Sequence, residues 1–436
     1  MSADRPLRAA LTALGCKVNY AEMAELAGAL AAEGIEVVAD DEPADIRVLN
    51  SCTVTLQADA TTRQRLARLR RIDPTCHLVL TGCSVDGNPH QYLATAADGQ
   101  PLLPSGVDAV FANVDKPRIA EHLVTLARRR GAARMAVLPA PALRTRGFLK
   151  VQDGCDHRCT YCTVWRARGG RSISVPPSEV LRRSAAMLDQ GHRELVLSGV
   201  DLGAYGQDLT PRRRLADLVE ALLPLCGSDA RLRLSSVNAN DIDERLAELT
   251  AHPRLCSHWH IPLQSGSDSI LRAMHRGYRS SQYRRVVGWL RHADGDTELT
   301  TDIMVGFPAE TDEDHRATVD LVGELEFLHC HVFRYSPRPG TPAADLRARV
   351  DDATARQRSR DVRRAALRSG LQRRRRTVGR RLEVLWEAVE NGTARGRSSG
   401  YHAVVVADER LRAGTLTGVR ISAVEGEELR GTVAAP

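Results

Sequence analysis

The chain has 436 residues, a formal net charge of +7 and ten cysteines. Its length accommodates two or three domains. No apolar run approaches the ~18 residues that a membrane span needs, and the first residues lack the pattern of a secretory signal. We therefore expect a soluble cytoplasmic protein whose cysteines are metal ligands and buried thiols, with no disulfide framework. The positive charge favours a polyanionic partner, but an aromatic content of 4% argues against extended base-stacking surfaces.

The first part of the chain alternates strand and helix patterns. Buried strands are predicted at 7–15, 46–51 and 77–82, with helices at 19–33 and 56–72. Strands that alternate with helices indicate a parallel α/β sheet.

Each of these three strands runs directly into a cysteine: Cys16, Cys52 and Cys83. In open α/β sheets, ligands bind at the carboxyl ends of the strands. Three cysteines that are far apart in sequence would therefore meet at one edge of one sheet. A single cysteine there would be a small buried hydrophobe, but three in equivalent places favour a three-cysteine iron–sulfur cluster. The remaining cysteines outside recognisable motifs are interpreted as packing residues: Cys76, Cys226, Cys256 and Cys330.

The most informative motif is the CxxxCxxC formed by Cys155, Cys159 and Cys162. Three thiolates at this spacing can hold three irons of a [4Fe–4S] cluster, which leaves the fourth iron open to a substrate. Zinc is the main alternative, but it normally takes four ligands. The only neighbouring candidate for the fourth is His157, which lies between the cysteines. A disulfide would leave one of the three thiols unpaired.

A linker is predicted at 126–146, which is rich in Arg, Ala and Pro. Six strand-like runs follow, at 147–152, 193–199, 231–237, 258–264, 298–306 and 329–336. Helical stretches separate them, including 178–190, 241–250, 280–292 and 311–326. Six βα units predict an open, partial (β/α) barrel. The CxxxCxxC follows the first of its strands, on the face where such barrels place their chemistry.

The last part of the chain combines a basic helix with a β-rich tail. Residues 353–381 contain twelve Arg and one Asp. We predict that this helix presents a phosphate-contacting surface, and a solvated helix face is the alternative. The tail, 382–436, carries five short strand patterns, which predict a small antiparallel barrel of the oligonucleotide-binding kind. The contiguous arginines at the end of the helix are the candidate phosphate contacts: Arg373, Arg374, Arg375 and Arg376.

Together these segments resemble the methylthiotransferase family of radical SAM enzymes over nearly the whole chain. Further similar stretches lie at 197–203, 260–267, 301–308 and 338–344. The resemblance implies an α/β protein with three domains. They are an N-terminal methylthiotransferase domain with an auxiliary cluster (1–125), a partial (β/α)6 radical SAM core (141–376) and a TRAM-like RNA-binding domain (377–436).

The resemblance also implies cofactors and partners. The cluster on Cys155, Cys159 and Cys162 would bind and cleave S-adenosylmethionine, and the cluster on Cys16, Cys52 and Cys83 would carry sulfur. A second S-adenosylmethionine would supply the methyl group. The partners would be the anticodon stem-loop of tRNA, a one-electron reductant such as flavodoxin or ferredoxin, and a sulfur donor. Residues at strand ends are the candidates for holding S-adenosylmethionine: Gly199, Val200, Asp201, Ser235 and Gln264.

The run Gly15–Asn19 with Glu22 resembles the branch that acts on N6-threonylcarbamoyladenosine at position 37 of tRNA. There, the hydrogen on C2 of the base would be replaced by SCH3. The alternatives are isopentenyladenosine in tRNA, an aspartate of a ribosomal protein, and an RNA-binding iron–sulfur protein without turnover. The chain departs from the family pattern at Trp165-Arg166, Asn238 and Arg334. Arg166 and Arg334 are candidate partners for the carboxylate of the threonylcarbamoyl group, because guanidinium pairs well with carboxylate.

Overall fold

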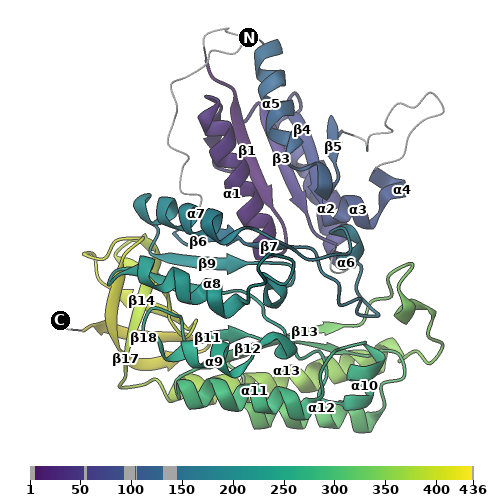
Figure 1. Ribbon diagram of the computed structural model, residues 1–436, viewed down its shortest axis with the longest axis vertical. Helices are drawn as coiled ribbons and strands as arrows, with labels where there is room; N and C mark the ends of the chain where they lie inside the picture. Colours follow the sequence, from purple (N-terminus) through teal and green to yellow (C-terminus); the bar gives the residue numbers. More distant parts are fainter. Residues whose placement is uncertain (1–4, 54–55, 93–103, 105, 131–144, 435–436) are drawn as a thin grey trace. The chain divides into compact units, whose positions relative to one another are not determined.

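The computed structural model describes residues 5–53, 56–92, 104, 106–130 and 145–434 (Figure 1). The chain divides into two compact units. The N-terminal unit comprises 1–143, 153–156 and 162–171, and the C-terminal unit comprises 144–152, 157–161 and 172–436. The predicted boundary at 376/377 lies inside the C-terminal unit. Most of the predicted linker, from 131 to 144, and the boundary at 141 lie outside the described residues. None of the described helices combines the length and apolar character that crossing a membrane requires.

The N-terminal unit contains a five-stranded parallel sheet in the order β2-β1-β3-β4-β5. Its strands are β1 (Arg8–Ala13), β2 (Glu36–Val38), β3 (Ile46–Ser51), β4 (His77–Gly82) and β5 (Ala109–Phe111). The three predicted strands are confirmed as β1, β3 and β4. The sequence analysis missed β2 and β5, because three residues are too short to show a strand pattern.

Helices cover both faces of this sheet (Figure 1). They are α1 (Lys17–Ala32), α2 (Leu56–Ile72), α3 (Cys83–Gly87), α4 (Pro89–Tyr92) and α5 (Arg118–Arg129). Val48 of β3 packs in one core with Leu30 of α1 and Leu123 of α5. The next residue, Leu49, packs in a second core with Leu69 of α2. Successive residues of a strand point to opposite faces, so a sheet covered on both faces gives the continuous apolar runs seen in the sequence.

The C-terminal unit contains the expected six parallel strands in two groups, β6-β9-β10 and β11-β12-β13. An isolated bridge between Ser236 and His260 connects the groups. The strands are β6 (Gly147–Lys150), β9 (Glu194–Ser198), β10 (Arg231–Leu234), β11 (His258–His260), β12 (Glu298–Val305) and β13 (His329–Arg334). All six predicted barrel strands are therefore confirmed. The two-residue strands β7 (Gln152–Asp153) and β8 (Ile173–Ser174) follow β6 in the chain.

Helices alternate with these strands. They are α7 (Pro177–Asp189), α8 (Leu215–Leu222), α9 (Glu244–Glu248), α10 (Asp268–Ala273), α11 (Ser280–Ala293), α12 (Asp312–Leu325) and α13 (Asp352–Arg375). The short helix α6 (Val164–Ala167) belongs to the N-terminal unit. Short 3-10 turns are η1 (Asn113–Asp115), η2 (Leu202–Ala204), η3 (Leu223–Cys226), η4 (Ala239–Asp241), η5 (Leu249–Ala251) and η6 (Pro342–Asp345). The four cysteines that were interpreted as packing residues are all buried.

The tail forms a closed five-stranded barrel in the order β14-β15-β16-β18-β17 (Figure 1, yellow). Its strands are β14 (Arg381–Glu390), β15 (Thr393–Ser398), β16 (Ala403–Ala407), β17 (Leu416–Glu425) and β18 (Glu428–Val433). Trp386, Val404 and Leu429 lie in its core. The five predicted strands are confirmed, with one correction: β16 and β18 pair in parallel, so the barrel is not entirely antiparallel.

A buried charge network joins the tail to the amino ends of the barrel strands. Glu194 of β9 binds Arg231 and Arg233 of β10 at 2.7 Å each. All three side chains are at most 1% exposed. Arg231 also donates to the carbonyl oxygen of Arg397, and Arg233 to that of Ser399, both at 2.9 Å. Burial alone would raise the pKa of Glu194, but Arg233 and Arg231 hold it well below its usual range. The tail is thus built into the barrel through charges that have no access to water.

Candidate iron–sulfur and cofactor sites

Cys16, Cys52 and Cys83 follow three neighbouring strands of the N-terminal sheet, β1, β3 and β4. Cys16 precedes α1 and Cys83 begins α3. The structure brings the three together as expected. The thiols of Cys16 and Cys83 are close enough to interact electrostatically, and the sulfur of Cys52 lies beside Gly15.

Two glycines permit this close approach. Gly15 has φ +84°, and a Cβ there would lie 2.5 Å from the Cys52 sulfur. Gly82 has φ +101°, and a Cβ there would lie 2.5 Å from the backbone nitrogen of Ser51. Only glycine combines a positive φ with such contacts, so the residue before Cys16 and the residue before Cys83 are both dictated by the backbone.

A buried group of charged side chains surrounds these cysteines. The Arg168 side chain is 1% exposed and donates from Nε to the Cys83 sulfur at 3.3 Å. Its Nη1 donates to the Glu22 carboxylate at 2.5 Å, and its Nη2 donates to Asn19 Oδ1 at 2.9 Å. Lys116 binds the same Glu22 carboxylate. Burial alone would lower the pKa of Arg168, but Cys83 and Glu22 hold it well above the usual value.

The charged side chains of this group are paired with one another. Two buried cations, Arg168 and Lys116, share one buried carboxylate, Glu22, and the partly exposed Asp153 lies 3.2 Å from Arg168. A buried charge is costly unless it is paired. Arg168 donates to one of three neighbouring thiols and so favours the thiolate form that iron binds, and the donor set therefore fits an iron–sulfur cluster.

The contacts of Asn19 and Glu22 explain the structural role of the motif Gly15–Asn19 with Glu22. Asn19 donates to the carbonyl oxygens of Leu14 and Ser51, which ties two strand ends together. Glu22 holds Arg168 and accepts a hydrogen bond from Asn50 at 3.0 Å. Sequence reasoning missed Arg168 and Lys116. Arg168 stands among other arginines, and nothing in the local pattern distinguishes a buried arginine from an exposed one.

The cysteines of the CxxxCxxC motif belong to both units: Cys155 and Cys162 to the N-terminal unit and Cys159 to the C-terminal unit. Within the C-terminal unit, Cys159 is 8% exposed, and its sulfur accepts a hydrogen bond from Arg276 Nη1 at 3.4 Å. Arg276 Nη2 donates to Asn238 Oδ1 at 2.6 Å, and Asn238 Nδ2 donates to Asp201 Oδ1 at 2.9 Å. A continuous chain of polar contacts therefore runs from Cys159 to Asp201.

This series of polar contacts ends at His157. Its Nε2 lies 3.0 Å from an Asp201 carboxylate oxygen and 3.8 Å from one of Asp241. Hydrogen bonds to Asp201 and Asp241 raise the pKa of His157 to about 10. Two carboxylates therefore hold the imidazole in place.

The same series of polar contacts explains why residue 238 departs from the family pattern. An amide can donate to Asp201 and accept from Arg276 at once, whereas the glutamate expected there could only accept. A carboxylate at 238 would also face the carboxylate of Asp201. Asparagine is therefore the residue that joins these two charged groups.

The five candidates for binding S-adenosylmethionine lie after β9, β10 and β11. Ser235 is 4% exposed, and its hydroxyl has no hydrogen-bond partner among the described residues, as fits a group that binds a polar ligand. Gln264 has φ +68°, a strained conformation typical of functional sites. The Asp201 carboxylate is instead used by Asn238 and His157. Gly199 and Val200 connect β9 to this segment.

The structure separates the six candidate substrate arginines into two groups. Arg166 is exposed and lies over the Trp165 ring at 4.9 Å, and Arg334 is half-exposed and pairs with Asp352. Arg375 at the end of α13 and Arg376 just after it are exposed, and Arg376 pairs with Glu326. The expectation of phosphate contacts is wrong for the other two, because Arg373 and Arg374 are only 7% exposed. They bind Glu298 and the carbonyl oxygen of Glu427, at 2.9 Å and 3.1 Å.

A polar group on β11–β13 was not anticipated. Ligand atoms of His260, Asp302 and His331 all lie within 4.8 Å of one another. Ile303 and Val332, their neighbours in sequence, pack into the helix-covered core, so Asp302 and His331 face the opposite side of the sheet. Burial alone would raise the pKa of Asp302, but the hydrogen bond to His260 holds it below its usual value.

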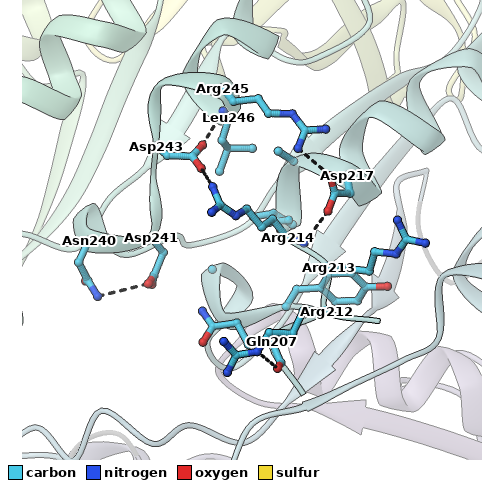
Figure 2. Close-up of a pocket in the computed structure, with 14 residues that line it drawn as sticks. Gln207, Arg212, Arg213, Arg214, Asp217, Asn240, Asp241, Asp243, Arg245 and Leu246 are labelled. Atoms are coloured by element: carbon cyan, nitrogen blue, oxygen red, sulfur yellow. Dashed lines mark hydrogen bonds and ion pairs between the residues drawn. The ribbon is translucent and has the colours of Figure 1, made fainter. Parts of the chain in front are cut away.

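A cavity of about 530 Å³ lies among the loops after β9 and β10 (Figure 2). Three consecutive arginines, Arg212 to Arg214, contribute to its lining. Figure 2 shows Arg214 paired with Asp243 and Arg245 paired with Asp217, at 2.9 Å and 2.7 Å. These internal ion pairs compensate much of the positive charge of the cavity.

The chain matches known families in both of its units. Residues 149–322 match the Radical SAM superfamily, and residues 8–100 match the uncharacterized protein family UPF0004. The fold is similar to that of the radical S-adenosylmethionine methyltransferase TsrM from Kitasatospora setae. The TM-score is 0.55 and the identity 15%, over 77% of this chain and 75% of that chain. The C-terminal unit thus contains a Radical SAM domain, and the structural similarity supports its fold.

Several characterised relatives match nearly the whole chain. A threonylcarbamoyladenosine tRNA methylthiotransferase MtaB from Thermotoga maritima is 36% identical over 95% of this chain and 94% of its own length. Its counterpart from Chlamydia pneumoniae is 33% identical over 97% of each chain. A tRNA-2-methylthio-N(6)-dimethylallyladenosine synthase from Chloroflexus aurantiacus is 32% identical over 96% of this chain and 90% of its own length. The chain belongs to the radical SAM methylthiotransferase family. As such it is a transferase that uses S-adenosylmethionine and two [4Fe–4S] clusters.

Proposed function

We propose that this enzyme replaces the hydrogen on C2 of N6-threonylcarbamoyladenosine, at position 37 of tRNA, with a methylthio group. The observation that carries the proposal is the 36% identity, over 95% of the chain, to an enzyme named for that substrate. The run Gly15–Asn19 with Glu22 supports the same branch. An unactivated aromatic C–H bond is beyond ordinary acid–base chemistry, so the cofactor supplies the radical.

We assign the two clusters to the two cysteine sets. Cys155, Cys159 and Cys162 hold the cluster that binds and cleaves S-adenosylmethionine, and Cys16, Cys52 and Cys83 hold the auxiliary cluster. Three protein ligands for each cluster leave one iron open. Arg168 and Arg276 each bind one of these cysteines, and their positive charge supports thiolate ligands at both places. The residues that bind S-adenosylmethionine are Gly199, Val200, Asp201, Ser235 and Gln264, with Asp201 acting through its neighbours.

The anticodon stem-loop is the substrate of this reaction. Arg375 at the end of α13, Arg376 just after it and the tail barrel supply phosphate contacts, which position RNA without reading its sequence. Arg166 and Arg334 are exposed, so they are the arginines left for the threonylcarbamoyl carboxylate. The reaction takes place in the cytoplasm and needs a one-electron reductant, such as flavodoxin or ferredoxin, and a sulfur donor.

Isopentenyladenosine tRNA is the second candidate substrate, supported by the relatives that are 31–32% identical and named for it. A direct comparison separates the two. The anaerobically reconstituted enzyme is incubated with S-adenosylmethionine, a reductant and matched tRNAs that carry either modification, and the nucleosides are analysed by mass spectrometry. We expect the methylthio group on the threonylcarbamoyl nucleoside alone. Product only from the isopentenyl tRNA, or only from a ribosomal protein added as a third substrate, would refute the proposal.

A further inference from the structure

Each cysteine set includes one sulfur that is bound by a guanidinium group. In the N-terminal unit, Arg168 Nε lies 3.3 Å from the Cys83 sulfur. In the C-terminal unit, Arg276 Nη1 lies 3.4 Å from the Cys159 sulfur. A thiolate needs no such donor to ligate iron. The repetition of a charge-assisted N–H···S contact in two unrelated folds therefore calls for a role beyond ligation.

The two arginines differ in what binds their remaining nitrogens. Arg168 is held by the Glu22 carboxylate at 2.5 Å, so part of its charge is compensated. The groups that hydrogen-bond to the remaining nitrogens of Arg276 include Asn238 Oδ1 at 2.6 Å and the Tyr278 hydroxyl at 3.2 Å, both neutral. The Asp302 carboxylate is close enough to Arg276 to interact with it electrostatically, but no direct ion pair joins them among the described contacts. Arg276 also lies 5.0 Å from the centre of the Tyr278 ring. The two sulfurs are therefore exposed to different net electrostatic fields.

Reduction of a [4Fe–4S] cluster adds one negative charge. Hydrogen bonds to the cysteine sulfurs and nearby positive charge stabilise the reduced form, and so raise the reduction potential. A nearby carboxylate has the opposite effect. The charged side chains near Cys83 include Arg168, Lys116 and Glu22. Cys159 receives its hydrogen bond from Arg276, which has no carboxylate bound directly to it among the described contacts.

We propose that Arg168 and Arg276 are positioning residues that set the reduction potentials of the two clusters separately, Arg168 through Cys83 and Arg276 through Cys159. Glu22 opposes Arg168 and sets how much of its charge reaches the auxiliary cluster. The inference rests on the cluster ligands proposed above. Its consequence is that one electron donor meets two clusters of different potential, so that the S-adenosylmethionine-cleaving cluster and the sulfur-carrying cluster need not be reduced together.

The test measures each cluster alone in the full-length protein. The variant C155A/C159A/C162A retains only the auxiliary cluster, and C16A/C52A/C83A retains only the other. Each protein is reconstituted, its iron is counted, and its midpoint potential is measured by titration followed with electron paramagnetic resonance. R168Q is expected to make the auxiliary cluster about tenfold harder to reduce at a fixed potential, which is about 59 mV for one electron. R276Q is expected to do the same to the other cluster.

Matched controls come from exchanging the backgrounds. R276Q in the auxiliary-only protein and R168Q in the other are expected to leave the midpoint unchanged. E22Q is expected to shift the auxiliary midpoint in the positive direction, opposite to R168Q. A general loss of stability would not shift the midpoint potential in opposite directions in E22Q and R168Q.

Each outcome is decisive. Unchanged midpoints in R168Q and R276Q proteins that retain their iron would overturn the inference, and so would a shift of both clusters by either substitution. If R168Q fails to retain iron, the sign of the E22Q midpoint shift tests the role of Arg168 at Cys83. For Cys159 the corresponding variant is R276K, which keeps the charge and is expected to shift the midpoint less than R276Q. If the triple-alanine proteins themselves retain no iron before any arginine is changed, the proposed ligand assignment fails instead.

Discussion

The substitution Glu194→Gln tests whether the tail is an integral part of the barrel. Glu194 is fully buried and binds two arginines that are at most 1% exposed. Glutamine keeps the size of the side chain but removes its charge. Arg231 and Arg233 would then be buried cations without their carboxylate, and breaking a buried pair in this way costs about 3–5 kcal/mol. For a unit of this size, that loss lowers the melting temperature on the order of 6–15 °C.

The assay is thermal unfolding followed by circular dichroism, with E324Q as the matched control. Glu324 binds Arg284 at 2.7 Å, but both side chains are about half exposed. Such surface pairs contribute about 0–1 kcal/mol, so E324Q is expected to change the melting temperature very little. Similar melting temperatures for E194Q and E324Q would refute the reasoning that a desolvated charge network holds the tail.

The same network predicts a pH dependence. The pKa of Glu194 is lower in the folded protein than the ordinary value of about 4.3. A lowered pKa means that the stabilisation is complete above the ordinary value and is lost as the pH falls below it. Wild-type stability should therefore decline more steeply than that of E194Q as the pH falls from about 5. Parallel declines would show that the carboxylate is not the titrating group.

Three other predictions concern the iron content, the tail and tRNA binding. Reconstitution should give about eight irons per chain, and replacing either set of three cysteines with alanine should halve the iron; full iron content after replacing Cys16, Cys52 and Cys83 would refute an auxiliary cluster. Deleting 382–436 should lower the melting temperature of what remains, because Arg231 and Arg233 are deprived of carbonyl acceptors in the tail; an unchanged melting temperature would show that the tail is only tethered. R375Q/R376Q should weaken tRNA binding and flatten its salt dependence by about 0.7–0.9 in log–log slope for each phosphate that the variant no longer binds. R373M should mainly destabilise the fold. Weaker tRNA binding in R373M and a lower melting temperature in R375Q/R376Q would contradict the assignment of these arginines.

The sequence predicted the elements that carry strong periodic signals. The strands before Cys16, Cys52 and Cys83 are continuous apolar runs, and their equivalent ends placed three distant cysteines at one sheet edge. The six barrel strands were predicted from strand-like runs separated by helical stretches, and the five tail strands from short alternating patterns. The short strands β2 and β5 gave no signal because each has three residues.

The sequence could not predict which charged residues are buried. Residues 373–376 are four consecutive arginines, yet the first two are buried and the last two exposed. Their burial depends on what each side chain packs against, which the sequence does not reveal. Arg168 and Arg276 were missed for the same reason. Their partners, Glu22 and Asn238, are 146 and 38 residues away. A sequence pattern reports local periodicity and carries no information about such distant pairings.

The most direct test of the proposed chemistry is the nucleoside content of tRNA from cells that lack this gene. Complementation with the wild-type chain should restore the methylthio derivative of N6-threonylcarbamoyladenosine. Complementation with either triple-alanine variant, C16A/C52A/C83A or C155A/C159A/C162A, should leave the unmodified precursor. Restoration of the product by either variant would contradict a mechanism with two clusters. Unchanged threonylcarbamoyl nucleosides in the absence of the gene would contradict the proposed substrate.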